Sequence, residues 1–153
     1  MAAARAEQIL AAIKTLLTGL TTTGANIQRG QIYIHEKAAL PAIALMMGAD
    51  VPALEYQTGL IDWELTVIVE ATTRTSERYI AMDSGIDTRL NLIRKEVYAA
   101  MLADHTLGLA FVIDVSPGTA AEPILSGEGD MPIASQVSNF VISYRTSRAD
   151  ISA

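Results

Sequence analysis

The sequence contains no cysteine and only two histidines among its 153 residues. Without cysteine the chain forms no disulfide, offers no thiolate nucleophile and binds no zinc through sulfur. His35 and His105 have no other histidine near them in the sequence, whereas a metal site needs clustered ligands. A Gly-x-Ser-x-Gly elbow is missing as well. We therefore expect no catalytic residue, metal or cofactor, and the sequence predicts that the protein is not an enzyme.

Long apolar runs are also missing, although 50% of the residues are hydrophobic and the mean hydropathy is +0.29. The longest nearly apolar run, at 38–49, is interrupted by Pro41 and Gly48 and is shorter than the ~20 residues that span a bilayer. We expect a protein that is made in the cytoplasm, has no contact with a membrane, and forms one domain over residues 1–153. Residues 147–153 have little apolar content, and we expect them to form a flexible tail.

Positive charge is scarce, because 11 Lys and Arg residues stand against 17 Asp and Glu residues, which gives a formal net charge of −6. The deficit lies in two segments, 38–73 and 96–144, that contain acids but no Lys or Arg. An acidic chain of this kind is unsuited to general nucleic-acid binding. Two interpretations stay open: a solubilising surface, or a surface that repels a polyanion or attracts a basic partner.

Hydrophobic periodicity predicts two helices and seven strands. Apolar residues recur at helical spacing over 3–19 and again over 76–103, and Gly19 and Gly108 follow these segments as helix-ending residues. Short alternating or continuous apolar runs predict strands at 27–35, 42–47, 51–58, 61–72, 111–115, 123–125 and 136–146.

Gly, Pro, Ser and Asp residues mark the connections between these elements. We expect turns at 48–50 and 116–118, a hairpin around Gly59, and an acidic loop at 126–132. The resulting order is one helix, four strands, a second helix and three strands. The sequence therefore predicts an α+β fold, in which a mainly antiparallel β-sheet has two helices packed on one face and a β-hairpin extension.

Four strings of residues, spread over most of the chain, are informative in combination. They are LPAIAL at 40–45, WELTV at 63–67, LADHTLG at 102–108 and FVISYRT at 140–146. In their order, and in the overall chain length, they resemble the tail terminator (tail completion) proteins of long-tailed bacteriophages. This family includes the minor tail protein U of lambda-like phages.

The resemblance implies a structural protein of the virion that is assembled in the host cytoplasm. Such proteins form a hexameric ring that caps the head-proximal end of the tail tube, stops tube polymerisation and provides the docking surface for the head or neck connector. The implied partners are further copies of the chain, the tail tube protein and the connector protein. DNA only passes through the lumen, and an acidic lining suits this role because like charges do not trap the polyanion.

We expect ring and tube contacts in the hairpin at 50–71, in the loop at 126–132, and on the mixed-charge face of the second helix. In a heterologous ring, the basic helix face of one subunit would meet the acidic hairpin of its neighbour. The interface candidates are Asp50, Glu55, Tyr56, Trp63, Arg78, Arg89, Arg94 and Lys95. The acidic candidates for the lumen or the ring ends are Glu55, Glu122, Glu128 and Asp130.

Two other classes of protein remain as alternatives. Another neck or head-completion connector of the virion would share the small α+β, ring-forming plan. A non-viral homo-oligomeric binding module is disfavoured because site chemistry is missing from the sequence. The mass in solution helps to discriminate, since a monomer that assembles only on tail tubes suits a terminator and a constitutive ring of twelve suits a connector. A stable monomer with a ligand pocket suits neither of these virion proteins.

Overall fold

A six-stranded β-sheet forms the centre of the protein in a computed structural model that describes residues 3–30, 40–56, 58–74, 86–126 and 133–152. Two helices and six strands follow one another along the chain. They are α1 (Arg5–Leu17), β1 (Ile27–Arg29), β2 (Ala42–Glu55), β3 (Leu60–Arg74), α2 (Ile86–Leu102), β4 (Val112–Ala120), β5 (Ile124–Ser126) and β6 (Ile133–Ser147). The predicted α+β class is confirmed.

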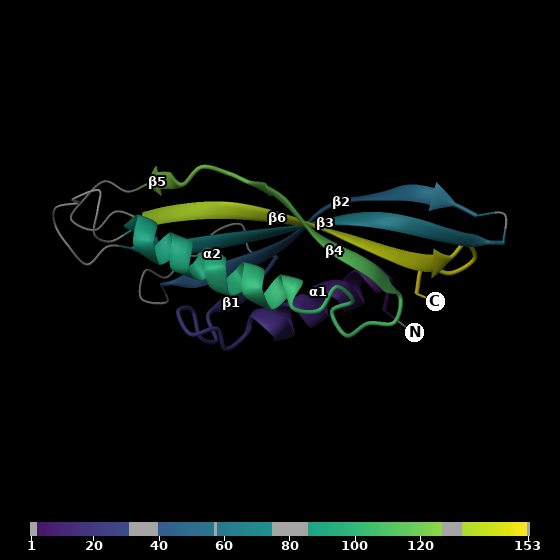
Figure 1. Cartoon of the computed structure of the whole chain (residues 1–153), viewed down its shortest axis with the longest axis horizontal. Helices are drawn as coiled ribbons and strands as arrows, with labels where there is room; N and C mark the ends of the chain where they lie inside the picture. Colours follow the sequence, from purple (N-terminus) through teal and green to yellow (C-terminus); the bar gives the residue numbers. More distant parts are fainter. Residues whose placement is uncertain (1–2, 31–39, 57, 75–85, 127–132, 153) are drawn as a thin grey trace.

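The strands lie in the order β1-β2-β3-β6-β4, and β5 pairs with the beginning of β6. Among the described strands, only β1 and β2 pair in parallel, and the other neighbouring pairs are antiparallel. The central pair, β3 and β6, is matched along its whole length, from Leu60 opposite Ser147 to Arg74 opposite Ile133. Both helices lie on one face of this twisted, elongated sheet (Figure 1), as the sequence predicts.

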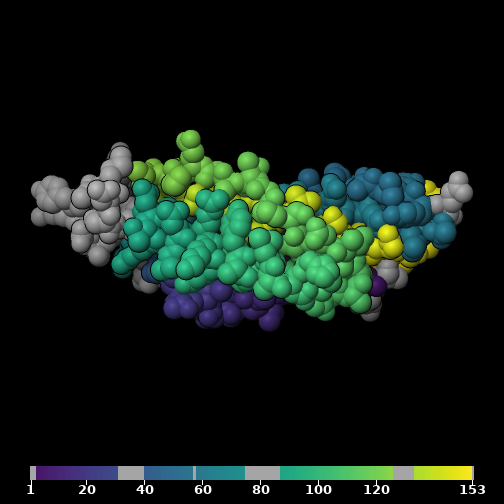
Figure 2. Space-filling model, viewed as in Figure 1, coloured from purple at the N-terminus to yellow at the C-terminus, as the bar shows by residue number. Residues whose placement is uncertain are grey.

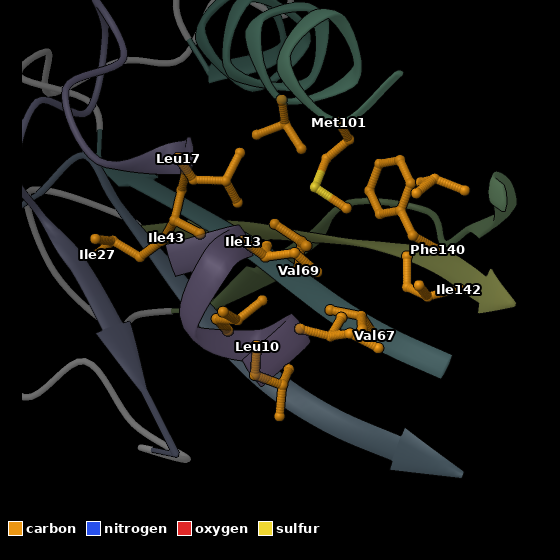
Figure 3. Close-up of a cluster of buried hydrophobic side chains, with 14 of the residues drawn as sticks. Leu10, Ile13, Leu17, Ile27, Ile43, Val67, Val69, Met101, Phe140 and Ile142 are labelled. Atoms are coloured by element: carbon orange, nitrogen blue, oxygen red, sulfur yellow. The ribbon is translucent and has the colours of Figure 1, made fainter. Parts of the chain in front are cut away.

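Alternation along β3 and β6 explains why one face of the sheet is buried. Val67 and Phe140 are direct ladder partners, as are Leu65 and Ile142, and all four side chains are fully buried. Side chains of a strand point to opposite faces in turn, so these residues lie on the helix-covered face. Figure 3 shows Phe140, Ile142 and Val67 directed toward the helices, where they form the core.

Each helix contributes an apolar stripe at helical spacing to this core. In α1 the stripe is Ile9, Ile13 and Leu17, and in α2 it is Leu90, Ile93, Val97 and Met101, all 2% exposed or less. Polar contacts fix the layers around this core. Glu7 of α1 forms an ion pair with Arg29 of β1. Glu96 of α2 accepts hydrogen bonds from the amide of Thr22, at 3.0 Å, and from its hydroxyl, at 2.8 Å.

The predicted turn at 48–50 is wrong, because the two strands expected at 42–47 and 51–58 form the single strand β2. Its register against β3 shifts between Met47 and Asp50, which is the signature of a β-bulge. Gly48 lies at this bulge, where an added Cβ would approach the carbonyl oxygen of Thr66 to 3.0 Å. Glycine therefore permits a close strand contact here rather than a reversal of the chain.

The turn predicted at 116–118 is also wrong, since these residues belong to β4. Proline is compatible with an edge strand, where its missing N–H needs no ladder partner, and β4 is an edge strand of the sheet. Other expected elements are shorter in the described residues: β1 ends at Arg29 and α2 begins at Ile86. The rest of three expected elements lies outside the described residues: 31–35 of the first strand, 76–85 of the second helix and 127–132 of the acidic loop.

The predicted hairpin extension is present. The end of β2 and the start of β3 run beyond the helices (Figure 1), and β2 residues 51–55 are all exposed. The chain end contacts both this hairpin and the first helix. The amide of Arg148 donates to the carbonyl of Gly59 at 2.7 Å, and the amide of Arg5 donates to the carbonyl of Ile151 at 3.0 Å.

Candidate interaction surfaces

The hairpin end, which we define as residues 54–56 and 58–62, is held by an arginine of β6. Arg145 donates to both carboxylate oxygens of Asp62, from Nε at 2.6 Å and from Nη2 at 2.9 Å. Tyr56 donates to the same carboxylate at 2.9 Å, and the guanidinium of Arg145 lies 5.0 Å from the centre of the Tyr56 ring. The hydrogen bonds from Arg145 lower the pKa of Asp62, so this carboxylate is charged at neutral pH.

A second ion pair joins the chain end to the hairpin end. Arg148 donates from Nη2 to Glu55 at 2.7 Å, and the two side chains are 62% and 57% exposed. Exposed pairs of this kind contribute little to stability. Of the predicted candidates, Glu55 and Tyr56 are thus brought together at the hairpin end, where each has a partner within the chain.

Asp50 and Trp63 lie together beside a small pocket of about 60 Å³, which Arg5, Tyr144 and Ile151 also line. Tyr144 donates to one oxygen of Asp50 at 2.8 Å, while the other oxygen is buried without a partner. Burial raises the pKa of Asp50, and it also raises the pKa of Tyr144.

The Nε of Arg5 is likewise buried without a hydrogen-bond partner. The pocket lined by Arg5 and Asp50 is large enough to admit water, although most of its lining is apolar. The indole N–H of Trp63 donates to the hydroxyl of Thr146 at 2.9 Å, and its partly buried ring packs against the core. Within the monomer, Asp50 and Trp63 therefore connect β2 and β3 to β6.

Three of the basic candidates lie on α2, away from the hairpin end (Figure 1). Arg89, Arg94 and Lys95 are exposed; Arg89 donates to the carbonyl of Arg74 at 3.2 Å, and Arg94 lies over the ring of Tyr98 at 5.2 Å. Figure 2 shows α2, in teal, across the middle of the helix-covered side. Arg78 lies outside the described residues. The basic candidates thus form an exposed surface on the helix layer.

The acidic lumen candidates are not gathered in one place. Glu122 is exposed in the segment between β4 and β5, while Glu55 lies at the hairpin end and is paired with Arg148. Glu128 and Asp130 lie outside the described residues.

Acids that were not among the candidates share the face of the sheet opposite the helices. Glu64 and Asp114 are both ladder partners of Ser143, and Glu70 is opposite Val137. We call this surface the open face. Its central members are Glu64, Thr66, Ile68, Glu70, Asp114, Val137, Asn139, Val141 and Ser143, all of them partly or fully exposed.

Charge on the open face is predominantly negative. Glu64, Glu70 and Asp114 form no ion pair with another described residue, whereas Asp62 and Arg145, on the same face, neutralise one another. The alternation along 61–70 is a signal that places Glu64 and Glu70 on one side of a strand. Asp114 joins them only through the pairing of β4 with β6.

Two apolar features lie at opposite ends of the elongated molecule. Ile124 and Leu125, which we call the β5 tip, are 62% and 61% exposed, the highest values for large apolar side chains in the described part of the chain. Figure 2 shows the light-green chain around β5 protruding from the upper edge of the molecule. The end pocket has a volume of about 290 Å³ and is lined by Leu60, Ala110, Phe111, Ile113, Arg145, Thr146 and Ser147.

Sequence reasoning missed both apolar features and the two arginines of the chain end. The sequence does not show whether a short apolar strand is exposed or buried, because both kinds of strand have the same composition. The end pocket is assembled from β3, β6 and the segment before β4, which are distant in the chain. Arg145 occupies an outward position in the alternation of β6, and this is a signal that it faces away from the core.

The described residues contain no group of three or more His, Cys, Asp or Glu side chains arranged to hold a metal ion. Among the helices in the described part of the chain, none is long and apolar enough to cross a membrane. Comparisons with protein-family models and with curated protein sequences found no match to the chain.

Proposed function

We propose that this protein is the subunit of a hexameric ring that caps the head-proximal end of a bacteriophage tail tube. In this role the ring stops polymerisation of the tube, provides the docking surface for the head or neck connector, and lets DNA pass through its lumen. Its partners are further copies of the chain, the tail tube protein and the connector, and its place is in the virion.

The observation that carries the proposal is the contrast between the two sides of the sheet. The helix layer presents charges of both signs, with the exposed cations Arg89, Arg94 and Lys95 beside exposed acids such as Asp87. The open face presents the acids Glu64, Glu70 and Asp114. A ring subunit needs an inner and an outer side with different chemistry, because only the inner side meets DNA. A mixed-charge helix side and a mainly acidic open face suit such a subunit.

The composition of the open face supports a wetted lumen rather than a buried contact. Thr66, Asn139 and Ser143 place small polar groups between the acids, and Glu64 is exposed. A surface of this kind is costly to bury against another subunit, because unpaired carboxylates lose their hydration. If the open face lines the lumen, its carboxylates remain hydrated, and their negative charge keeps the DNA backbone from binding to the ring.

The hairpin end supports a contact with the tail tube. It projects past the helix layer, and it is held by Arg145 and Arg148 rather than being left loose. An extension ordered before binding loses less conformational entropy when it docks on a partner. We therefore assign a contact with the tail tube to the hairpin end.

Tail assembly with and without this protein tests the proposal. Purified tail tube protein is polymerised from its initiation complex, and tube lengths are measured by electron microscopy. Tubes that overgrow in the absence of the chain, and stop at a uniform length with a ring at the free end in its presence, are the expected result. Tubes of normal length that fail to join heads would instead indicate a connector, and no effect on either step would refute a role in tail completion.

A further inference from the structure

The β5 tip and the end pocket are complementary in chemistry and separate in space. One is an exposed apolar projection of two large side chains, and the other is a largely apolar depression of about 290 Å³. Figure 1 shows β5 at one end of the long axis, with the start of β3 and the end of β6, which line the pocket, toward the other end. A molecule that carries both features can join a second copy of itself head to tail.

We propose that the β5 tip of one subunit inserts into the end pocket of its neighbour, and that this contact closes the ring. The inference rests on the proposed function, because it names the surface by which the ring subunits associate. Ile124 and Leu125 of one copy pack against Leu60, Phe111 and Ile113 of the next.

Exposure of both elements in the monomer favours this contact. Ile113, on the pocket wall, is 43% exposed, and the two residues of the β5 tip are the most exposed large apolar side chains described. Ile124 pairs with Ser135 and Leu125 with Ala134, so the two side chains leave the strand on opposite faces and give β5 no buried side. Removing these side chains from water supplies a driving force for association.

Charge around the two features is complementary as well. Glu122 is exposed two residues before the β5 tip and forms no ion pair with another described residue. Arg148 follows the pocket residue Ser147 and directs Nη2 to Glu55, which leaves further guanidinium donors for a second carboxylate. Glu122 of the inserted copy is therefore the partner for Arg148 at the rim of the pocket.

The free edges of the sheet are poor alternatives for this contact. Strand β2 contains Pro52 and two register shifts, and β4 contains Pro117 and two register shifts. Proline and bulges are the features that prevent strands of different molecules from pairing edge to edge. Association through the ends of the molecule avoids these obstacles and leaves the open face directed toward the lumen.

Cysteine cross-linking tests the contact directly, because the natural chain has no cysteine. The double variant Ile124→Cys/Ile113→Cys is assembled on tail tubes and oxidised. A ladder of disulfide-linked oligomers up to the hexamer is expected, since each link must join two copies. The matched control is Leu16→Cys/Ile113→Cys, in which the first cysteine lies on α1; this variant should give no ladder. Equal ladders in both variants, or none in the first, would overturn the proposed contact.

A second variant separates the contact from the terminator role. Replacing Ile124 with aspartate should weaken assembly of the chain on tail tubes roughly tenfold or more in co-sedimentation with the tubes, whereas Ile124→Val retains it and Leu16→Asp leaves it unchanged. Tube length is measured on the same samples. If Ile124→Asp leaves both the ring and the tube length unchanged while wild-type chain still limits growth, the contact is wrong and the terminator role stands. If a ladder forms but the chain never affects tube length, the contact stands and the terminator role falls.

Discussion

Arg145 and Asp62 lie directly opposite one another in the β3–β6 ladder and share two hydrogen bonds, of 2.6 and 2.9 Å, although they are 83 positions apart in the chain. The side chain of Asp62 is only 14% exposed, and Tyr56 donates to the same carboxylate. A two-pronged contact between guanidinium and carboxylate is directional as well as charged. The end of the hairpin is therefore held by the last strand in addition to the backbone hydrogen bonds of its own turn.

Replacing Arg145 with alanine should destabilise the protein more than replacing Arg148 with alanine does. The first change leaves a partly buried Asp62 with one remaining partner, whereas the second removes an ion pair in which both side chains are more than half exposed. Urea unfolding, followed by the fluorescence of the single tryptophan, Trp63, provides the comparison. Equal losses in the two variants would show that the two hydrogen bonds to Asp62 add nothing to the fold.

The effect of Arg145→Ala should also depend on pH. Arg145 holds the pKa of Asp62 below its ordinary value, so the unfolded chain binds a proton more readily at this site than the folded chain does. The stabilisation is then complete above the ordinary Asp pKa of about 3.9, and it is lost as the pH falls through the lowered pKa of the folded state. The difference between wild type and variant should narrow below about pH 4, and a constant difference down to pH 2 would argue for packing instead.

Asp50→Asn should have the opposite pH dependence. Burial raises the pKa of Asp50, so the contribution of this group is greatest below the ordinary pKa of aspartate and is lost as the pH rises through the raised folded value. The neutral amide keeps an acceptor for Tyr144 and removes a charge whose second oxygen has no partner.

At neutral pH the Asp50→Asn variant should therefore be at least as stable as wild type. The gain should stay below about 1 kcal/mol, because the side chain is partly exposed to solvent. Thermal unfolding at pH 7 and pH 4 measures the difference, which should shrink at the lower pH. A clear loss of stability at pH 7 would mean that the fold stabilises the charged carboxylate of Asp50, contrary to the effect of its burial.

Gly48→Ala should cost about 1–2 kcal/mol of unfolding free energy, since overpacking against the backbone outweighs the entropy gained by replacing glycine. The added Cβ would lie 3.0 Å from the carbonyl oxygen of Thr66, which belongs to the adjacent strand and cannot rotate away. Ala49→Ser, at the exposed neighbouring position, is the control and should change stability by less than about 0.5 kcal/mol. Chemical denaturation decides the point, and an unchanged or raised stability for Gly48→Ala would contradict the packing of this bulge.

Charge reversal on the open face tests its assignment to the lumen. The double variant Glu64→Lys/Glu70→Lys should still stop tube growth, but it should lower the yield of infectious particles roughly tenfold or more, because a basic lining binds the DNA backbone. Asp87→Lys, at an exposed position of α2, is the control and should leave the infectious yield unchanged. Normal infectivity of the double variant in particles of normal length would place the open face away from the DNA path.

Several features of the fold were predictable because they depend on local patterns. The two helices follow from apolar residues at helical spacing, as in Ile9, Ile13 and Leu17, and the alternation from Trp63 to Val69 follows from the two faces of a strand. Gly48 was misread as a turn residue, because the sequence cannot distinguish a glycine that reverses the chain from one that admits a neighbouring backbone. Pro117 was misread for a similar reason, since an edge strand tolerates the missing N–H.

The sequence by itself determined the fold class, the absence of cysteine chemistry and the separation of acids from bases along the chain. These depend on composition and on periods of a few residues. Only the tertiary structure decided that Arg145 neutralises Asp62, that Glu64, Glu70 and Asp114 share an open face, and that the β5 tip and the end pocket lie at opposite ends. The physical reason is that strand register and order bring together residues that are distant in the chain, and no local pattern specifies which strands become neighbours.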